Sequence, residues 1–414
     1  MEIAMKPVPV SRNYFTPGVI VLLILALNGL VFLAGRFIFG LGAVTNLDNS
    51  YPWGIWIGID VAAGVALAAG GFTTAALGHL MHRESYNVVV RPALLTAMLG
   101  YTFVAFGVFI DIGRYYYLWH PLVMWNGNSA LFEVGICVTI YVNVLYIEFL
   151  PIVTERFIGK VNLRGPLARL NRAVESLLRV MDRTLSKTMF IFIIAGVVLS
   201  CLHQSSLGTM MVIAGQKMHP LWQTPILPLL FLLSAIAVGF PMVIFESLLA
   251  SRSLGLKPEM HVLSRLGRFI VPTLGIYLAF KIGDMVIRET HVYLMEFTTE
   301  SVMYALEIVL GVIIPLRLAL SRAVLNSPLG LFVTSSLVIL GVLLNRINNF
   351  IVAYTPPYAT HTYYPSFGEL SVTIGCAAIL VLLYRAFVLN FPIISLPDKR
   401  TARRAKYSIQ GTSA

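Results

Sequence analysis

The amino-acid sequence predicts an all-α, polytopic membrane protein, and three observations lead to that prediction. Of the 414 residues, 57% are hydrophobic and only 12% are charged, whereas soluble domains average about 25% charged residues. The charged residues are largely excluded from apolar runs that are long enough, at about 20 residues, to cross a bilayer. The net charge of +11 arises in short segments between these runs, where basic side chains meet lipid headgroups. We therefore expect membrane lipids, and no nucleic acid, as partners.

Ten apolar runs are long enough to span a membrane as helices. The first follows Lys6 and Arg12, as in a signal peptide, but it continues to Phe39 without a small-residue cleavage pattern. We therefore expect it to be an uncleaved span. The ten predicted spans cover approximately residues 17–39, 54–78, 92–113, 129–152, 188–207, 224–250, 268–289, 298–320, 328–354 and 369–391.

The stretch 161–183 differs from the spans because it is basic and carries leucine and valine at helical spacing. This pattern predicts a cytoplasmic amphipathic helix that lies on the membrane surface.

The distribution of Lys and Arg predicts the orientation of the chain. Of the 30 basic residues, 24 fall in the segments that share one side with both termini. Cytoplasmic segments are enriched in Lys and Arg, so both termini are predicted to be cytoplasmic. The other six lie in the opposite loops or the outer halves of the spans: Arg36, Arg114, Lys217, Lys281, Arg288 and Arg346.

Ionisable and polar residues gather in the outer halves of spans two to five. Such residues are costly in lipid and usually mark a functional site. Four consecutive spans joined by mostly short loops are expected to form an antiparallel bundle, which we place at residues 53–207. A quinone headgroup needs hydrogen-bonding groups for its two carbonyls and an aromatic or apolar slot. The predicted quinone-binding residues are Trp56, Asp60, Asp111, Arg114, His203 and Gln204.

A second pattern predicts a proton path. Glu133, Tyr141 and Glu148 share one face of span four, and Glu133 and Glu148 are separated by about 22 Å along the helix. Span three offers a parallel stripe that includes Tyr101 and Asp111. The alternative is that these faces serve packing alone. Likewise, Lys281, Asp284, Glu307 and Arg346 are equally well explained as interhelical ion pairs.

Cofactor motifs are absent from the sequence. A bundle haem needs two facing histidines at membrane depth, but of eight histidines only His203 lies well inside a span. The three cysteines lack metal-ligand spacing, and P-loop, GxSxG and HExxH motifs are missing. We therefore expect no haem, iron–sulfur cluster or other metal in this chain, and no catalysis by it alone.

Several stretches resemble the NrfD/polysulfide-reductase membrane-subunit family, most closely its hydrogenase-associated HybB branch. They include PWGIWIGIDVAAGVALAAGG (52–71), DIGRYY (111–116), HQSSLGTMMVIAGQKMHPLWQ (203–223) and GFPMVIFE (239–246). The resemblance implies two adjacent four-helix bundles, the second at residues 224–354, in a multi-pass protein of the bacterial inner membrane. It also implies menaquinone or ubiquinone as substrate, near the outer end of the first bundle.

The resemblance further implies partners on the periplasmic side. These are a ferredoxin-like iron–sulfur subunit and a further catalytic subunit of hydrogenase, molybdopterin or cytochrome c type. We expect this chain to pass electrons between the iron–sulfur subunit and the quinone pool, and the acidic face of span four would add proton translocation. Two alternatives stay open: a cytochrome c-linked menaquinone reductase of the same fold, and a secondary transporter that uses its intramembrane carboxylates.

Overall fold

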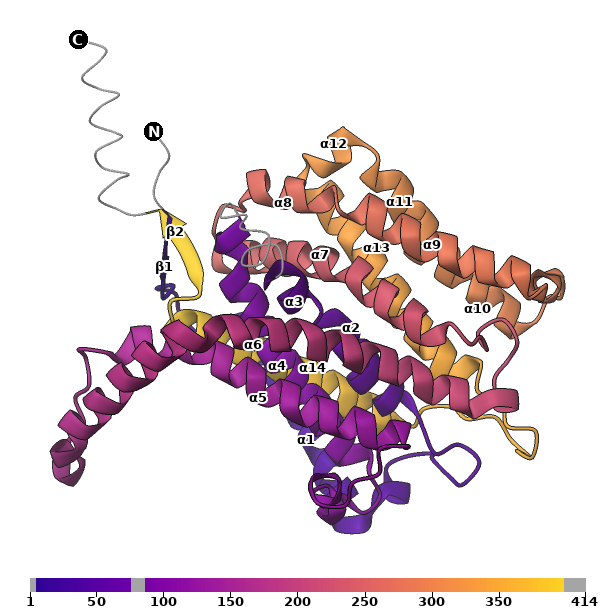
Figure 1. Cartoon of the computed structure of the whole chain (residues 1–414), viewed down its shortest axis with the longest axis horizontal. Coiled ribbons are helices and arrows are strands. Elements are labelled where there is room, and N and C mark those ends of the chain that lie inside the picture. Colours follow the sequence, from indigo (N-terminus) through magenta and orange to yellow (C-terminus); the bar gives the residue numbers. More distant parts are fainter. Residues whose placement is uncertain (1–4, 76–85, 398–414) are drawn as a thin grey trace, which may run out of the picture.

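The chain folds into a bundle of long helices, which confirms the all-α, polytopic membrane class (Figure 1). The computed structural model describes residues 5–75 and 86–397. Within these residues, ten helices are long and apolar enough to cross a membrane: Pro17–Phe39, Trp56–Thr74, Val88–Asp111, Ala130–Phe157, Gly165–Lys217, Leu227–Leu254, Met260–Ile287, Thr299–Ala319, Pro328–Val352 and Phe367–Asn390.

Several of the ten spans are built from more than one helical segment. The α-helices are α1 (Pro17–Phe39), α2 (Gly64–Leu67), α3 (Gly70–Ala75), α4 (Asn87–Asp111), α5 (Ala130–Phe157), α6 (Asn171–Ala214), α7 (Leu227–Leu254), α8 (Met260–Gly267), α9 (Ile270–Ile287), α10 (Thr299–Ile308), α11 (Ile314–Ala319), α12 (Arg322–Leu325), α13 (Pro328–Ile347) and α14 (Phe367–Asn390). Short 3₁₀ turns are η1 (Leu41–Ala43), η5 (Tyr115–Tyr117), η6 (His120–Leu122), η7 (Gly165–Leu170), η8 (Gly215–Lys217) and η9 (Thr290–Met295).

Three spans contain π-helical turns, which the sequence does not predict. These are η2 (Trp56–Ala63), η10 (Val309–Ile313) and η11 (Asn348–Val352). A π-turn widens the helix locally and changes which residues share a face, and such turns are frequent at functional sites. The segment η2 carries Asp60, so the direction of that side chain depends on this irregularity.

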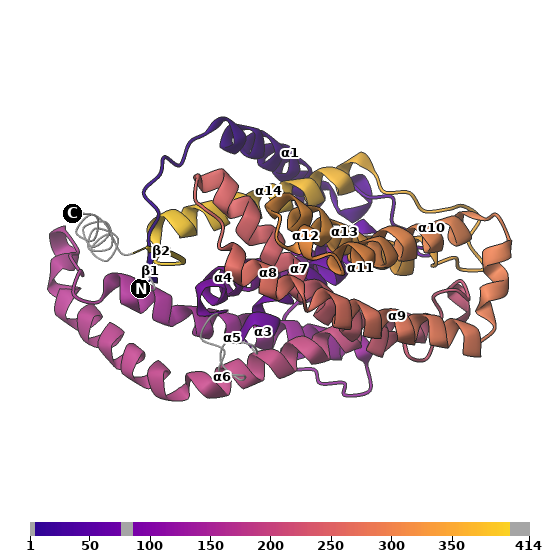
Figure 2. The same ribbon diagram turned by 90° about the horizontal axis from the view of Figure 1, so that it is seen from above.

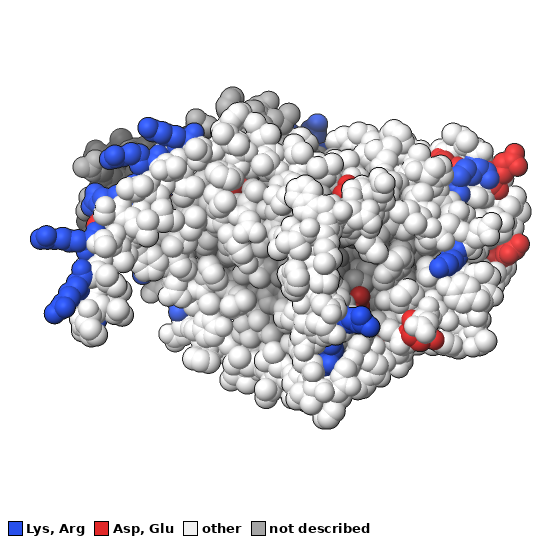
Figure 3. Space-filling model, turned by 60° about the horizontal axis from the view of Figure 1, so that its bottom comes forward, with Lys and Arg blue, Asp and Glu red and all other residues white. Residues whose placement is uncertain are grey.

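The two ends of the described chain meet at one end of the molecule. Strands β1 (Met5–Val8) and β2 (Ile394–Pro397) pair antiparallel, with Val8 opposite Ile394. We call this the terminal end, and the opposite end, which holds the loops 40–55, 112–129, 215–226, 288–298 and 353–366, the distal end. Lys and Arg gather by the terminal segments on the left of Figure 3, whereas most acidic side chains in view lie on the right beside a few basic ones, and the surface between carries few charges.

The helices pack as two neighbouring groups with one flanking pair. Helix α4 packs against η2, α2, α3 and α5, and α5 packs against α6. Helix α7 packs against α2, α3 and α6 on one side and against α9 and α13 on the other. Helices α1 and α14 pack together along their length, and Figure 2 places them on the side opposite α6. The first group and its flanking pair frame the candidate site described below.

The separate surface helix predicted at 161–183 is wrong as an element. Residues 171–183 continue into the fifth span as α6, a single helix of 44 residues. The sequence holds no Gly or Pro between 171 and 188 that would end the helix. At 1.5 Å per residue α6 is about 66 Å long, roughly twice the hydrocarbon thickness. Its first part therefore extends beyond the bundle at the terminal end (Figure 1).

Candidate functional site

A large cavity lies at the distal end, between η2, α4, α5, α6 and the loop that follows α4. Its volume is about 780 Å³, within the range of small-molecule sites. Most of its wall is aliphatic or aromatic. The lining residues include Trp53, Ile57, Val61, Ala105, Val108, Asp111, Trp119, His120, Asn126, Leu131, Phe132, Gly135, Val138, Leu207 and Met210. An apolar cavity with few polar groups suits a ring compound with an apolar tail.

Asp111 provides the carboxyl group of this cavity. It is the last residue of α4, and its Oδ1 atom is buried without a hydrogen-bond partner in the described part of the chain. A buried, unpaired acceptor is costly, so it calls for an explanation such as a bound water or ligand. His120 and Asn126 add further polar groups from the loop. The predicted role of Asp111 in quinone binding thus has a cavity to act in.

The cation beside Asp111 is Arg36 rather than the predicted Arg114. Arg36 is only 1% exposed, and its guanidinium donates to the carbonyls of Ile110 and Ile112 at 2.7 and 2.6 Å. These bonds satisfy carbonyls at the C-terminus of α4, where a cation also interacts favourably with the helix dipole. Arg114 lies in the distal loop and is exposed. The sequence identified Arg36 only as a basic residue in an outer half-span, because its hydrogen-bond partner Ile110 lies 74 residues away.

His203 lies one helical turn below the cavity, toward the terminal end. It is fully buried, and neither ring nitrogen has a partner among residues 5–75 and 86–397. Its ring centroid lies 5.7 Å from that of Tyr101, which in turn lies 4.3 Å from that of Tyr141. The Tyr101 hydroxyl is 3.4 Å from Ser200 Oγ. His203 therefore does not line the cavity, but it heads a buried polar cluster beneath it.

The depth of this cluster follows from helix geometry. Leu207 lines the cavity and follows His203 by four residues on α6, and Ala105 follows Tyr101 in the same way on α4. One turn of helix rises about 5.4 Å. Gln204 neighbours His203 and is fully buried, and its two side-chain polar atoms also lack partners in the described residues.

Glu148 joins the cluster from the terminal side. Its Oε1 atom lies 2.6 Å from where a Cβ on Gly196 would be, so a glycine on α6 makes room for the carboxyl. The Tyr141 ring touches the same spot at 3.7 Å. The structure thus brings Glu148, Tyr141, Tyr101 and His203 together in series. Three of the five residues of the predicted proton path belong to this series.

Glu133, also predicted for the proton path, lies apart from this series. It lies in the first turn of α5 and is exposed, and its Oε1 accepts a 2.6 Å hydrogen bond from Ser206 Oγ. It therefore sits at the rim of the bundle and not between Tyr141 and the cavity.

Trp56 and Asp60 face away from the cavity. Trp56 Nε1 donates to the Glu369 carbonyl at 3.1 Å, and Asp60 Oδ2 accepts from Thr373 Oγ1 at 2.7 Å, so both turn toward α14. The cavity is instead lined by Trp53, Ile57 and Val61, which follow one another at four-residue spacing. Convergence of all six predicted quinone-binding residues is therefore wrong: of the six, the cavity lining includes Asp111 but not Trp56, Asp60, Arg114, His203 or Gln204.

The polar residues of the second group form a packing network. Lys281 Nζ lies 2.6 Å from Glu307 Oε1, and Glu307 also accepts from Asn345, Asn348 and Trp222 at 2.8, 2.9 and 3.0 Å. Arg346 donates to Ser234 and lies over the Phe231 ring at 3.7 Å. The ion-pair interpretation holds for Lys281 and Glu307, whereas Asp284 pairs with Arg288 on its own helix.

Comparison with known proteins decides the family. Residues 43–356 match the family described as polysulphide reductase, NrfD. The chain belongs to the NrfD family. It is 33% identical to the probable Ni/Fe-hydrogenase 2 b-type cytochrome subunit of Escherichia coli, over 94% of this chain and 95% of that protein.

Two more distant NrfD relatives serve other complexes. The chain is 26% identical to the integral membrane subunit of the menaquinone reductase of Nitratidesulfovibrio vulgaris, over 86% of this chain and 85% of the relative. It is 24% identical to a selenate reductase subunit of Mesobacillus selenatarsenatis, over 93% of this chain and 95% of the relative. The relatives of this NrfD protein are thus membrane subunits of multi-subunit redox complexes, which confirms the resemblance found in its sequence.

Proposed function

We propose that this protein is the quinone-binding membrane subunit of a periplasm-facing redox complex, with the distal cavity as its quinone site. The observation that carries the proposal is the apolar cavity of about 780 Å³ that encloses the unpaired Oδ1 of Asp111. A quinone ring with the first part of its tail fits such a volume. The relatives in a hydrogenase and in a menaquinone reductase support the same substrate class.

The chemistry requires proton donors near the two quinone oxygens. Reduction of a quinone consumes two electrons and two protons, and one proton is added to each carbonyl oxygen. Asp111 is placed to hydrogen-bond one oxygen and to exchange a proton with it. His120 and Asn126 are further polar residues of the lining that can orient the ring. In the reverse direction the same groups would accept protons from a quinol.

Protons would reach the cavity through the buried series Glu148, Tyr141, Tyr101 and His203. Tyr101 and His203 are fully buried and Tyr141 is 1% exposed, while Glu148 lies toward the terminal end. If that end is cytoplasmic, as the Lys and Arg distribution predicts, proton uptake through this series would make quinone reduction electrogenic.

Electrons would arrive from an iron–sulfur partner seated on the distal loops. The loop after α4 exposes Tyr116, Trp119, Met124 and Trp125, of which Trp125 is 79% exposed. Large exposed aromatic groups mark an interaction surface or a membrane interface. Trp119 and Met124 also line the cavity, so a partner bound there would lie next to the quinone.

Filling the cavity tests the binding site. Gly135 lines it, and a Cβ there would meet only Pro121, at 3.9 Å, so Gly135→Leu projects a side chain into the space without a backbone clash. We expect the dissociation constant of a fluorescent quinone-analogue inhibitor to rise at least about tenfold, a loss of ~1.4 kcal/mol. The matched control is Gly275→Leu on α9, where a Cβ meets nothing within 4 Å. Equal affinity in both variants would contradict the proposed site.

Asp111→Asn tests the chemistry in the assembled complex. The amide keeps the size of the side chain but cannot donate and recover a proton as a carboxyl does. We expect inhibitor affinity to be largely kept while quinone reduction slows about 10²-fold or more, as for loss of a general acid. Turnover equal to that of the parent complex would exclude Asp111 as proton donor. The same assay separates this function from a transporter, which would have no quinone-dependent turnover.

A further inference from the structure

Glu246 is a buried acid that the proposed quinone site and the Glu148 series leave unused. It lies on α7, is 9% exposed, and its Oε1 atom has no partner in the described ranges. The hydroxyls of Thr96 on α4 and Tyr384 on α14 lie close enough to interact with its carboxyl group. Both hydroxyls are buried, and neither completes a hydrogen bond within the described residues. Three buried polar atoms from three helices thus lie close together, and none of them completes a hydrogen bond within the described residues.

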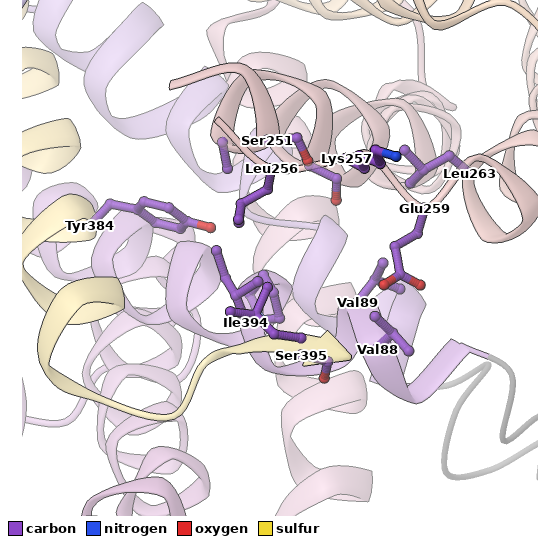
Figure 4. Close-up of a pocket in the computed structure, with 14 residues that line it drawn as sticks. Val88, Val89, Ser251, Leu256, Lys257, Glu259, Leu263, Tyr384, Ile394 and Ser395 are labelled. Atoms are coloured by element: carbon purple, nitrogen blue, oxygen red, sulfur yellow. The ribbon is translucent and has the colours of Figure 1, made fainter. Parts of the chain in front are cut away.

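On one side, this cluster of three polar groups lies next to the terminal end of the molecule. Tyr384 also lines a pocket of about 60 Å³ between the start of α4, the end of α7, α8 and β2. Figure 4 shows the Tyr384 hydroxyl directed into this pocket near Leu256 and Ile394, with the Glu259 carboxyl on the opposite side. Lys257, Ser247 and Ser251 supply further polar groups. The pocket therefore has the polar wall expected where protons enter from water.

On the other side, the cluster lies next to a cavity deeper in the bundle. Thr96 lines a cavity of about 190 Å³ between η2, α2, α4, α7, α13 and α14. A water molecule needs about 10–15 Å³ of such space, so several can fit. Asp60 and Thr373 line the same cavity and hydrogen-bond each other at 2.7 Å. Asp60 and Thr373 give water in this cavity polar partners, and Thr96 is a further polar residue of its mostly apolar wall.

Asp60 links this cavity to the quinone site. Gly107 lines the cavity, and a Cβ on it would lie 3.3 Å from the Cβ of Asp60. Asp111 follows Gly107 by one turn of α4, and the charges of Asp60 and Asp111 are close enough to interact. Asp111 lines the quinone cavity. Asp60 lies outside the lining of the quinone cavity, which contradicts a direct binding role. Its position next to both cavities instead makes it a link between them.

We propose that Tyr384, Glu246, Thr96 and Asp60, with water in the 190 Å³ cavity, form a second proton route from the terminal end to Asp111. The inference deepens the proposed function, because it assigns the residues that reprotonate Asp111 after it gives a proton to the quinone. Glu246 receives a proton from the terminal pocket and releases it to the water chain. Asp60 passes a proton to Asp111. The route runs through α14, α7, α4 and η2, and it shares no residue with the Glu148 series on α5, α4 and α6.

The route is tested in the full complex reconstituted in liposomes, with quinone reduction and proton uptake measured together. Glu246→Gln should slow turnover at saturating quinone at least about tenfold without raising KM, since proton supply and not quinone binding is lost. Thr96→Val and Tyr384→Phe each remove one hydroxyl and should slow turnover about threefold or more. In all three, the H₂O/D₂O rate ratio should rise, because proton transfer becomes rate-limiting.

The controls change the same residue types outside the route. Thr102→Val is on α4, where Thr102 Oγ1 bonds to the Met98 carbonyl at 2.7 Å, and Tyr146→Phe changes a tyrosine that is 42% exposed. Both should keep parental turnover. If Glu246→Gln lowers the yield of the complex, Thr96→Val and Tyr384→Phe decide the test.

Parental rates and isotope ratios in Glu246→Gln, or in both hydroxyl variants, would overturn the route. If Gly135→Leu still weakened quinone binding, the proposed function would stand and the route alone would fall. Unchanged quinone kinetics in Gly135→Leu and Asp111→Asn would instead remove the proposed function itself.

Discussion

Asp111 illustrates how single residues acquire a role from their position on a helix. It ends α4 at the distal end, so its carboxyl reaches the cavity while the two preceding turns, residues 103–110, stay apolar. Tyr101 lies ten residues earlier on α4, about 15 Å along the helix, and meets His203 below the cavity. Position along one helix thus separates a residue that lines the cavity from one that lies beneath it.

Glu148 and Glu133 test the first proton path at the residue scale. Glu148→Gln removes the acid that packs beside Tyr141, so quinone reduction should slow at least about tenfold. Glu133→Gln should change turnover little, because Glu133 is exposed at the rim and its carboxylate accepts from Ser206 rather than joining the series. Steady-state quinone reduction in membranes measures both. Glu155→Gln, an exposed acid paired with Arg91, is the control. Suppressed turnover in Glu133→Gln would instead return that residue to the path.

At the scale of elements, helical phase decides which residues of span two meet the cavity. Trp53, Ile57 and Val61 share the face toward α5 and α6, while Trp56 and Asp60 lie about 100° away and meet α14. Polar character alone does not reveal this phase, because the partner helix of Asp60 is more than 300 residues away in sequence.

Substitutions of Arg36 and Arg114 compare a buried cation that donates to backbone carbonyls with an exposed cation. Arg36→Gln leaves the Ile110 and Ile112 carbonyls without a charged donor, and each such bond contributes about 1.5–3 kcal/mol. We expect a lower thermal midpoint and, because α4 then frays at Asp111, slower quinone reduction. Arg114→Gln on the exposed loop should change the thermal midpoint little. Thermal unfolding and turnover of the purified variants measure the difference, and the reverse order of effects would contradict the assignment.

At the scale of the whole molecule, the flanking pair of α1 and α14 closes the first group of helices. The two helices touch through glycines, and a Cβ on Gly29 would lie 2.8 Å from the Cα of Gly375 and from the Ser371 carbonyl oxygen. Small residues allow this close approach, which is a common way for helices to associate in membranes. The second group holds the buried Lys281–Glu307 pair and packs against the first group through α7 and α6.

Gly29→Ala tests the packing of the flanking pair. The added methyl meets backbone atoms that cannot give way, so we expect a loss of about 1–3 kcal/mol and a lower thermal midpoint in detergent. Gly35→Ala on the same helix is the control, since its Cβ meets only the Val44 side chain, at 3.5 Å. Equal midpoints for the two variants would contradict the close packing.

The predicted orientation is tested by labelling single cysteines from outside the membrane. Trp125→Cys at the distal end should react with an impermeant maleimide in intact spheroplasts, and Arg172→Cys on the α6 extension should react only after lysis. The native Cys137, Cys201 and Cys376 lie in spans and should contribute little background. The opposite pattern would reverse the orientation and the direction of proton uptake.

The sequence by itself determined the class, the ten spans and the family of this protein. The reason is that transfer into lipid depends on the length and polarity of each segment, which are local properties. It also selected Asp111, His203, Tyr101, Tyr141 and Glu148, because ionisable or phenolic groups within apolar runs stand out.

Only the tertiary structure decided which of these residues meet. It paired Asp60 with Thr373, replaced Arg114 by Arg36, and joined the basic stretch at 161–183 to the fifth span. These outcomes depend on helical phase, on π-turns and on contacts between helices far apart in the chain, which no local pattern encodes. The cavities, and the unpartnered Glu246 between two of them, arise in the same way from the packing of several helices.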